Sequence, residues 1–220
     1  MSTNQLTAVD QAMAFCDASV PQPLIDAWSY TTTFAQANAR TVNDDPSTQA
    51  YFDAMTGELA KLAWNITEAS KVAYSNTANQ ITPAAIVSSI LNPYLAPDQQ
   101  AALGGLLNAF QQPPTSEINN FLTFWWNKGS TQGGKSNMAF GPLTVVNNAS
   151  DITMTYYSFN FSADSWRALF VARDSADLDV TAYRLRMNLN MALYNQISGD
   201  LIQKVGAKAA NHIATAELDL

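Results

Sequence analysis

Eight residues, Gly129 to Ser136, read GSTQGGKS and match G-x-x-x-x-G-K-[ST], the pattern of a phosphate-binding loop. Such a loop follows a β-strand and opens a helix, whose N-terminal amides hold the phosphate. The apolar stretch before Gly129 predicts a strand, but the residues after Ser136 alternate in polarity and include Pro142, which predicts another strand. We therefore interpret GSTQGGKS as a hairpin loop with Gly133 and Gly134 as turn residues, and keep a P-loop nucleotide hydrolase as the third functional hypothesis.

Other catalytic residue types are scarce. The chain carries one histidine, His212, and one cysteine, Cys16, so a two-histidine zinc motif, a cysteine-rich metal site and an intrachain disulfide are excluded. A Ser-His-Asp triad or a Cys-His pair would depend on His212, close to the end of the sequence. We expect no catalytic residues, no metal, no cofactor and no enzymatic activity. Cys16 is expected to be a buried thiol in a helix, with acylation as the alternative.

The composition limits the classes of partner. The chain has 220 residues, a formal net charge of −7 and 13% charged residues, and its Lys and Arg residues form no basic run. These features disfavour nucleic-acid binding and attraction to anionic lipid, so a zwitterionic phospholipid membrane is the favoured membrane partner. A low content of charged residues lowers the free-energy cost of placing a surface against lipid. A packed homo-oligomer would explain the low charge equally well.

The N-terminal sequence has neither the basic nor the apolar segment of a signal peptide. No run of 18 apolar residues predicts a transmembrane helix. We therefore expect a soluble form without a signal peptide. If the protein is a toxin, we expect it to act extracellularly, at the membrane of a target cell.

The first half of the chain shows mainly helical periodicity. Apolar residues recur at helical spacing over 5–16, over 21–31, and over 47–69. Further helices are predicted over 82–92, where Thr82 and Pro83 form a start signal, and over 97–112. We therefore expect residues 1–112 to form mostly helical layers.

In the second half the apolar period changes from 3.6 to 2. Strands are predicted over 120–126, over 137–147 with a bulge at Gly141–Pro142, over 151–161 with a slip at Tyr157, over 166–172 and over 178–191. Short polar links between them predict a mainly antiparallel sheet over 118–191. A helix follows over 199–214, so helices should cover both faces of the sheet.

The strands are rich in aromatic residues. The strands over 151–161 and 178–191 reach the length of a tilted bilayer-spanning strand, and each has an apolar and a polar face. The apolar and aromatic side chains form a sheet core under helices, or they meet lipid after the helices move away. The candidate membrane-interacting residues are Phe124, Trp125, Trp126, Tyr156, Tyr157, Phe159, Phe161, Trp166, Phe170, Leu185 and Met187.

The stretch from Phe121 to Met191 resembles the C-terminal part of the cytolytic Cyt δ-endotoxins of insecticidal bacteria. The resemblance runs through FWWNKGST (Phe124–Thr131), VVNNAS (Val145–Ser150) and WRALFVARDSADLDVTAYRLRMNL (Trp166–Leu189). Its closest part is LFVARDSADLDV, an apolar strand, a turn and the start of the long alternating strand. It covers about a third of the chain.

The resemblance implies an α+β fold in one Cyt-like domain, 1–220: a three-layer α/β/α sandwich with one mainly antiparallel sheet wrapped by helical hairpins. It also implies a toxin that binds phospholipid directly and permeabilises the membrane through its sheet strands, as oligomeric pores or by disruption. The strands would be 137–147, 151–161, 166–172 and 178–191. The second hypothesis is a non-lytic virulence factor of the same fold, tethered through acylated Cys16.

Overall fold

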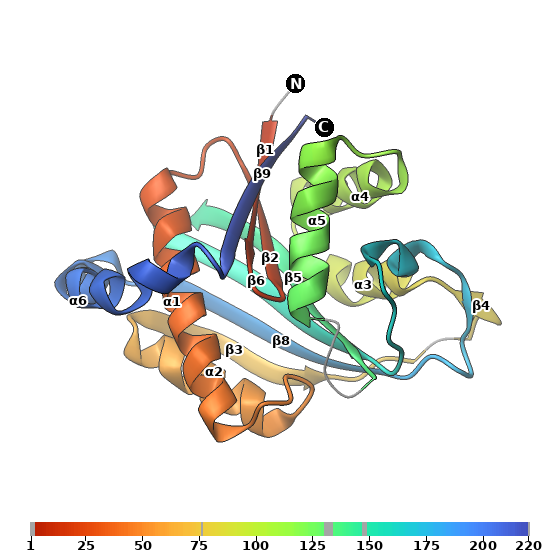
Figure 1. Ribbon diagram of the computed structural model, residues 1–220, viewed down its shortest axis with the longest axis horizontal. Helices are drawn as coiled ribbons and strands as arrows, with labels where there is room; N and C mark the ends of the chain where they lie inside the picture. Colours follow the sequence, from red (N-terminus) through yellow and green to blue (C-terminus); the bar gives the residue numbers. More distant parts are fainter. Residues whose placement is uncertain (1–2, 76, 130–133, 147–148, 220) are drawn as a thin grey trace.

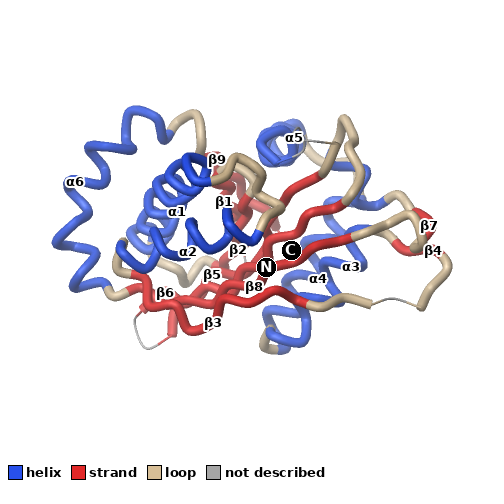
Figure 2. The backbone as a smooth tube through the Cα atoms, turned by 90° about the horizontal axis from the view of Figure 1, so that it is seen from below, coloured by secondary structure: helices blue, strands red, loops and turns tan. Residues whose placement is uncertain are grey.

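The computed structural model of the protein describes residues 3–75, 77–129, 134–146 and 149–219. A seven-stranded sheet lies between two groups of helices (Figures 1 and 2). The strands of this sheet are β1 (Thr3–Val9), β2 (Ala12–Asp17), β3 (Trp64–Val72), β5 (Ser136–Val146), β6 (Ala149–Phe159), β8 (Val180–Leu189) and β9 (Ile213–Asp219). The helices are α1 (Gln22–Val42), α2 (Gln49–Lys61), α3 (Pro83–Leu91), α4 (Pro97–Gln111), α5 (Ser116–Gly129) and α6 (Met191–Ala209).

The strands lie in the order β3-β8-β6-β5-β2-β1-β9. Every neighbouring pair is antiparallel except β2 and β5, which are parallel. Two short 3-10 helices, η1 (Asn92–Tyr94) and η2 (Trp166–Phe170), and a small separate pairing of β4 (Gln80–Ile81) with β7 (Arg173–Asp174) complete the described elements. The predicted fold class is therefore confirmed: an α+β, three-layer arrangement around one mainly antiparallel sheet.

Two apolar cores fill the space between the layers. The first core lies under α1, α2 and α6 and includes Trp28, Phe52, Met154 and Leu185; the second lies under α3, α4 and α5 and includes Tyr157. In Figure 1 the first group of helices is on the left and the second on the right. Since both faces of the sheet are covered, its central strands are buried on both sides.

The prediction of a helix over 5–16 is wrong, because these residues form the β1–β2 hairpin in the middle of the fold. Leu6 and Met13 enter the second core, while Val9 and Cys16 enter the first. A strand that is buried on both faces reads as a nearly continuous apolar run, and such a run can imitate helical spacing. Asp10, in the tight turn, has a φ of 47°, a left-handed conformation that Asp tolerates better than most residues.

The helix predicted over 47–69 ends early. Helix α2 stops at Lys61, Ala63 takes a left-handed φ of 71°, and β3 follows. Ile66 and Ala69 therefore lie in a strand of the sheet. With β1, β2 and β3 all inside residues 1–112, that part of the chain supplies three strands of the seven-stranded sheet, together with the short β4, as well as helices. The helices predicted over 21–31, 82–92 and 97–112 are confirmed by α1, α3 and α4.

Two predicted strands and the C-terminal helix also need correction. Residues 116–129 form α5, because Ile118, Phe121, Leu122, Trp125 and Trp126 recur on one helical face, and the stretch 166–172 is largely η2. Helix α6 spans Met191–Ala209 in place of 199–214, and the residues after it form β9 at the edge of the sheet.

Strand β5 crosses Gly141 and Pro142 without the predicted bulge. The pairing of Phe140 with Thr155 and of Leu143 with Ile152 keeps one register on both sides of the dipeptide. A Cβ atom on Gly141 would lie 1.9 Å from the backbone oxygen of Thr153, so the two strands approach closely here. Glycine is therefore required by contact with the neighbouring strand, and no extra residue is accommodated.

The predicted slip at Tyr157 is wrong for a similar reason. Strand β6 alternates regularly: Met154 and Tyr156 enter the first core, and Tyr157 and Phe159 enter the second. The apolar pattern changes parity because the aromatic residues move from one buried face to the other.

Candidate functional site

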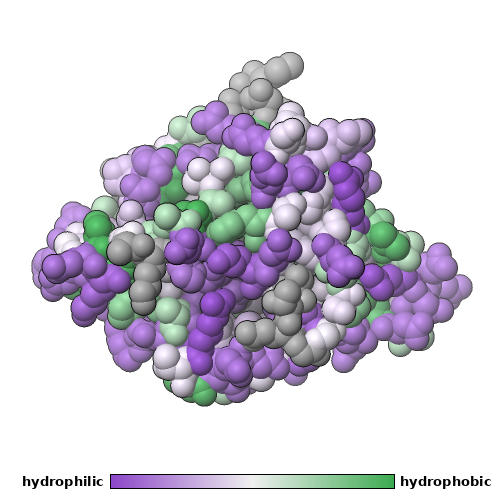
Figure 3. Space-filling model, in the orientation of Figure 1, coloured by the Kyte–Doolittle hydropathy of each residue, from purple (hydrophilic) through white to green (hydrophobic). Residues whose placement is uncertain are grey.

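The predicted membrane-interacting residues lie inside the protein, divided between the two cores. Tyr156, Leu185 and Met187 are in the first core. The other eight lie in the second core or pack against it: Trp125, Trp126, Tyr157, Phe159 and Trp166 are buried, and Phe124, Phe161 and Phe170 are partly buried. The side of the molecule seen in Figure 3 is accordingly mostly hydrophilic, with small separate apolar areas.

One face of the sheet is continuously apolar across its central strands. On β6 and β8 the residues of the first core stand opposite each other in register: Ile152 with Met187, Met154 with Leu185, and Tyr156 with Tyr183. Leu189 extends this row on β8, and Leu143 extends it on β5. We call these eight residues the apolar sheet face; helices α1, α2 and α6 cover it.

The opposite face of the same strands is polar along half of its length. Thr153 pairs with Arg186, and Thr155 pairs with Arg184. Toward Phe159 the face becomes aromatic and belongs to the second core. Strands β6 and β8 therefore combine a face that is apolar from Ile152 to Tyr156 and from Tyr183 to Leu189 with a face that carries two arginines and two threonines.

Arg184 fixes the polar face to its surroundings. Its guanidinium group is hydrogen-bonded to the carboxylate of Glu68 on β3, and it stacks over the ring of Tyr94 in η1 at 3.4 Å from the ring centroid. The hydrogen bond from Arg184 holds the pKa of Glu68 below its ordinary value. The cation thus joins the sheet to the segment between α3 and α4.

A few directed bonds hold the second helical layer to the rest of the molecule. The buried hydroxyl of Tyr157 donates to the carbonyl of Val87 on α3 at 3.1 Å. The indole N–H of Trp125 donates to the carbonyl of Gln11 in the β1–β2 turn at 2.8 Å. Burial raises the pKa of Tyr157, so its hydroxyl stays protonated and remains a donor. Each such hydrogen bond contributes on the order of 1 kcal/mol to stability. Apolar contacts in the second core supply the rest of the stabilisation of this helical layer.

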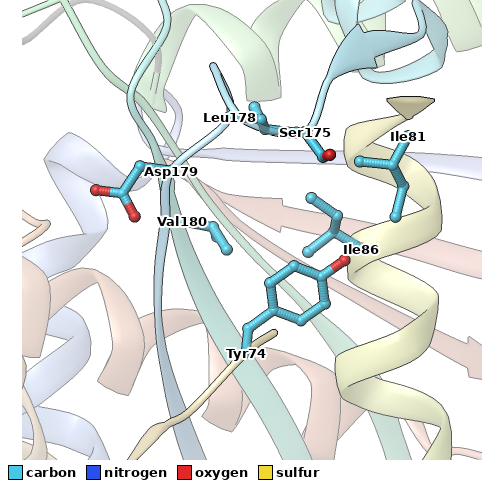
Figure 4. Close-up of a pocket in the computed structure, with 7 residues that line it drawn as sticks. All are labelled: Tyr74, Ile81, Ile86, Ser175, Leu178, Asp179 and Val180. Carbon is cyan, nitrogen blue, oxygen red and sulfur yellow. The ribbon is translucent and has the colours of Figure 1, made fainter. Parts of the chain in front are cut away.

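A pocket of about 200 Å³ lies where α3 meets the start of β8 (Figure 4). Tyr74 and Ile86 form part of its apolar wall, and Ser175 and Asp179 contribute the polar groups. The ring of Tyr74 lies below Ile86 in this view, with its hydroxyl directed toward Ile86. Neither a cation nor a histidine is among the residues that line this pocket.

A second pocket, of about 220 Å³, surrounds Asp10 in the β1–β2 turn. The carboxylate of Asp10 is nearly inaccessible and lies 2.9 Å from Nδ1 of His212, 3.3 Å from a guanidinium nitrogen of Arg40 and 3.9 Å from Nζ of Lys128. Nothing in the sequence indicates this cluster, because Asp10 and His212 are 202 residues apart. Arg40 and Lys128 stand in the last turns of α1 and α5, where cations balance the helix dipoles.

Cys16 lies in β2 and its side chain belongs to the first core. The residue is 4% exposed, and its sulfur lies 3.5 Å from the carbonyl oxygen of Gln5. The expected burial of the thiol is confirmed, while the expected helix around it is wrong.

The GSTQGGKS stretch lacks the local structure of a phosphate-binding loop. Residues 130–133 lie outside the described part of the chain. Helix α5 precedes them, where a strand was predicted, and β5 begins at Ser136, so no helix N-terminus follows Lys135. The Lys135 amine instead contacts Asp45 at 3.3 Å and the hydroxyl of Ser47 at 2.7 Å.

Among the described residues, no three His, Cys, Asp or Glu side chains gather closely enough to hold a metal ion. Every helix in this part of the chain is too short or too polar to cross a membrane.

No protein-family model matches the chain, and no curated protein matches it. Among solved structures, the chain is similar to a protein titled "delta-endotoxin", with 10% identity over 76% of this chain and 77% of that one and a TM-score of 0.37. It is also similar to the Evf virulence factor, with 10% identity over 88% of this chain and 77% of that one and a TM-score of 0.33. The first belongs to the group that residues 121–191 resemble. Because both TM-scores are below 0.5, the function proposed below rests on the residues of this chain.

Proposed function

We propose that the protein permeabilises membranes: it binds a phospholipid surface directly and inserts strands of its sheet after the helices over the apolar sheet face move away. The observation that supports this proposal most directly is the pairing on β6 and β8. Apolar pairs such as Met154 with Leu185 alternate with polar pairs such as Thr155 with Arg184. One face suits contact with acyl chains, and the other suits a water-filled lumen.

The dimensions of the strands agree with insertion. Strands β5 and β6 have 11 residues each and β8 has 10, which is the length of about 9–11 residues that a tilted strand needs to cross a bilayer core. In lipid every backbone N–H and C=O must be paired, so several chains would have to join their sheets edge to edge. Homo-oligomerisation on the membrane is therefore part of the proposal.

The direction of opening follows from the two faces. The residues of the apolar sheet face lie under α1, α2 and α6, so that layer must leave for the face to meet acyl chains. Lipid then replaces the helices as an apolar environment, and most of the burial free energy of the face is retained. With a net charge of −7, the chain favours a zwitterionic surface over an anionic one. The proposed activity requires no catalysis.

The test is dye release from phosphatidylcholine vesicles, combined with an environment-sensitive fluorophore on β5. Val145 packs on the side of the first core and its neighbour Thr144 points the opposite way, and both are half-buried. The fluorophore is attached to Val145→Cys or to the matched control Thr144→Cys, each in a Cys16→Ala background. On vesicles we expect the probe at 145 to shift to shorter wavelength and to be quenched by lipid-borne quenchers, and the probe at 144 to stay in water.

Two results would contradict the proposal separately. Absence of leakage, with and without limited proteolysis, would exclude permeabilisation. Leakage with the probe at 144 in lipid and the probe at 145 in water would exclude the apolar sheet face as the inserted face.

A non-lytic, acylated virulence factor is the second hypothesis. It is supported by the placement of Cys16 in the first core, where an acyl chain would find apolar surroundings once α1 moves. Mass spectrometry of the protein from its natural source decides the point, because an acyl chain adds mass to the 23.9 kDa polypeptide. An unmodified mass together with vesicle leakage would leave the lytic proposal alone.

A further inference from the structure

A third pocket, of about 340 Å³, lies at the end of the sheet where β6 and β8 run past the N-terminus of α2. Its floor continues the side of the sheet that carries the apolar sheet face, but the residues here are polar: Ser158 of β6 pairs with Thr181 of β8, one step beyond Tyr183. The pocket is lined further by Lys71 of β3 and by Lys135. We call it the hydroxyl pocket.

The N-terminus of α2 provides one wall of the hydroxyl pocket. Ser47 and the N-cap residue Thr48 line the pocket, and the first turn of the 13-residue helix carries no acidic side chain. The Thr48 hydroxyl caps the amide of Tyr51. The amides of Gln49 and Ala50 have no hydrogen-bond partner among the described residues. A helix end of this kind carries a partial positive charge and favours an anion.

Two hydroxyl groups of the floor are without partners, and they point to a ligand independently of the helix. Ser158 is 8% exposed and Tyr183 is 5% exposed, and neither hydroxyl makes a hydrogen bond within the described residues. The Tyr183 ring is fixed by stacking on Phe52 at 4.9 Å between centroids. Burial, and then the charges of Asp53 and Asp45, raise the pKa of Tyr183, so its hydroxyl is a neutral donor. Both residues line the pocket, so their hydroxyls can form hydrogen bonds with a polar ligand there.

The charges at the pocket favour an anionic ligand. Lys71 and Lys135 line it with one carboxylate, that of Asp179, while Asp45 lies behind Lys135 and is paired with it at 3.3 Å. The backbone amide of Asp179 is bonded to Asn160, which holds the residue in the rim. Lys71 is therefore the ammonium group of the pocket that has no ion-pair partner among the described residues, and it lines the same pocket as the N-terminus of α2.

We propose that the hydroxyl pocket binds a phosphate-type oxyanion. Lys71 and Lys135 supply the charge, the free amides of α2 and the hydroxyls of Ser158 and Tyr183 donate hydrogen bonds, and Asp45 holds Lys135 in place. Lys135, the lysine of GSTQGGKS, thus lies near the N-terminus of a helix. That helix is α2, which comes before Lys135 in the chain. The oxyanion could come from free phosphate or from the headgroup of a phospholipid, and the site does not depend on membrane permeabilisation.

The first experiment measures thermal unfolding and calorimetric binding of the full chain with inorganic phosphate, with glycerophosphocholine, and with chloride at equal ionic strength. We expect saturable stabilisation by at least one of the two phosphate compounds beyond that given by chloride. Binding of glycerophosphocholine alone identifies a headgroup diester as the ligand, and binding of phosphate alone identifies the free anion. If neither compound binds beyond chloride, the proposal is wrong.

Variants then place the ligand. Tyr183→Phe keeps the stacked ring and removes only the hydroxyl, and Lys71→Gln removes a charge that has no ion-pair partner among the described residues. Each should weaken binding about tenfold, as expected for the loss of one bond to a charged group. The control Lys204→Gln removes an exposed charge on α6 and should leave the affinity unchanged. Equal weakening by Lys204→Gln would show non-specific charge attraction and overturn the site.

Discussion

Replacement of Gly141 by alanine tests the central pairing of the sheet. A Cβ atom at this position would lie 1.9 Å from the backbone oxygen of Thr153 and 2.9 Å from Cα of Met154. Both are backbone atoms of a strand that is itself paired on its other side with β8, so neither can turn aside as a flexible side chain would. Overpacking in a core costs about 1–3 kcal/mol, and a backbone clash belongs at or above the top of that range. We therefore expect Gly141→Ala to lower the free energy of unfolding by about 3 kcal/mol or more.

Gly104 provides the matched control. It lies inside α4, and a Cβ atom there would meet nothing within 4 Å. Alanine is favoured over glycine in a helix interior by about 0.5–1 kcal/mol, so Gly104→Ala should raise the free energy of unfolding by that amount. The same chemical change is thus expected to act with opposite signs at the two positions.

The assay is urea unfolding, followed by circular dichroism for secondary structure and by tryptophan fluorescence for the cores. Coincident transitions justify a two-state treatment. A nearly neutral Gly141→Ala would show that β5 and β6 separate at this point, as a bulge would require, and the continuous register would then be refuted. If Gly141→Ala fails to accumulate while Gly104→Ala is produced normally, the outcome agrees with a large destabilisation.

Two further predictions concern the polar contacts of the sheet. Tyr157→Phe should lower the free energy of unfolding by about 1 kcal/mol, because the carbonyl of Val87 loses its buried donor. Tyr156→Phe should be close to neutral, because the Tyr156 hydroxyl makes no hydrogen bond within the described residues, and urea unfolding of both variants measures the difference. Because the bond from Arg184 lowers the folded pKa of Glu68, the stabilisation is present above the ordinary value of 4.5 and is lost as pH falls through the lower folded pKa. Glu68→Gln should therefore destabilise the protein at pH 7 and have little effect at strongly acid pH. Thermal unfolding measured across pH tests this, and an unfolding temperature with the same pH dependence in the variant and the parent protein would contradict the role of the pair.

The helices and strands that are bounded by strong local signals could be predicted from the sequence. Thr82 and Pro83 start α3 as expected, and the alternation of β8 places Leu185 and Met187 on one face. The elements in the middle of the three layers were harder, because burial on both sides removes the alternation that distinguishes a strand. The β1–β2 hairpin was predicted as a helix for this reason.

The candidate sites were predictable to different extents. The eleven candidate residues named from the sequence all lie in the two cores or against them, but the sequence could not divide them between the faces of the sheet. The parity change at Tyr157 is visible only when both neighbours of β6 are known. The pocket around Asp10 and the hydroxyl pocket join residues from strands and turns that are far apart in the chain. Contacts between such distant residues leave no pattern in the local sequence, so neither pocket could be predicted from composition or from motifs.

The parallel contact between β2 and β5 has a consequence for how the chain folds. It joins the hairpin of β1 and β2 to the antiparallel group of β5, β6, β8 and β3, and it can form only after the long intervening segment has been synthesised. Pairings of such large sequence separation form slowly, because the entropy of closing a long loop is lost before the contact is gained. During that interval the first hairpin has no partner on either edge. A chaperone that binds this hairpin should therefore raise the yield of refolding more than one that binds α4.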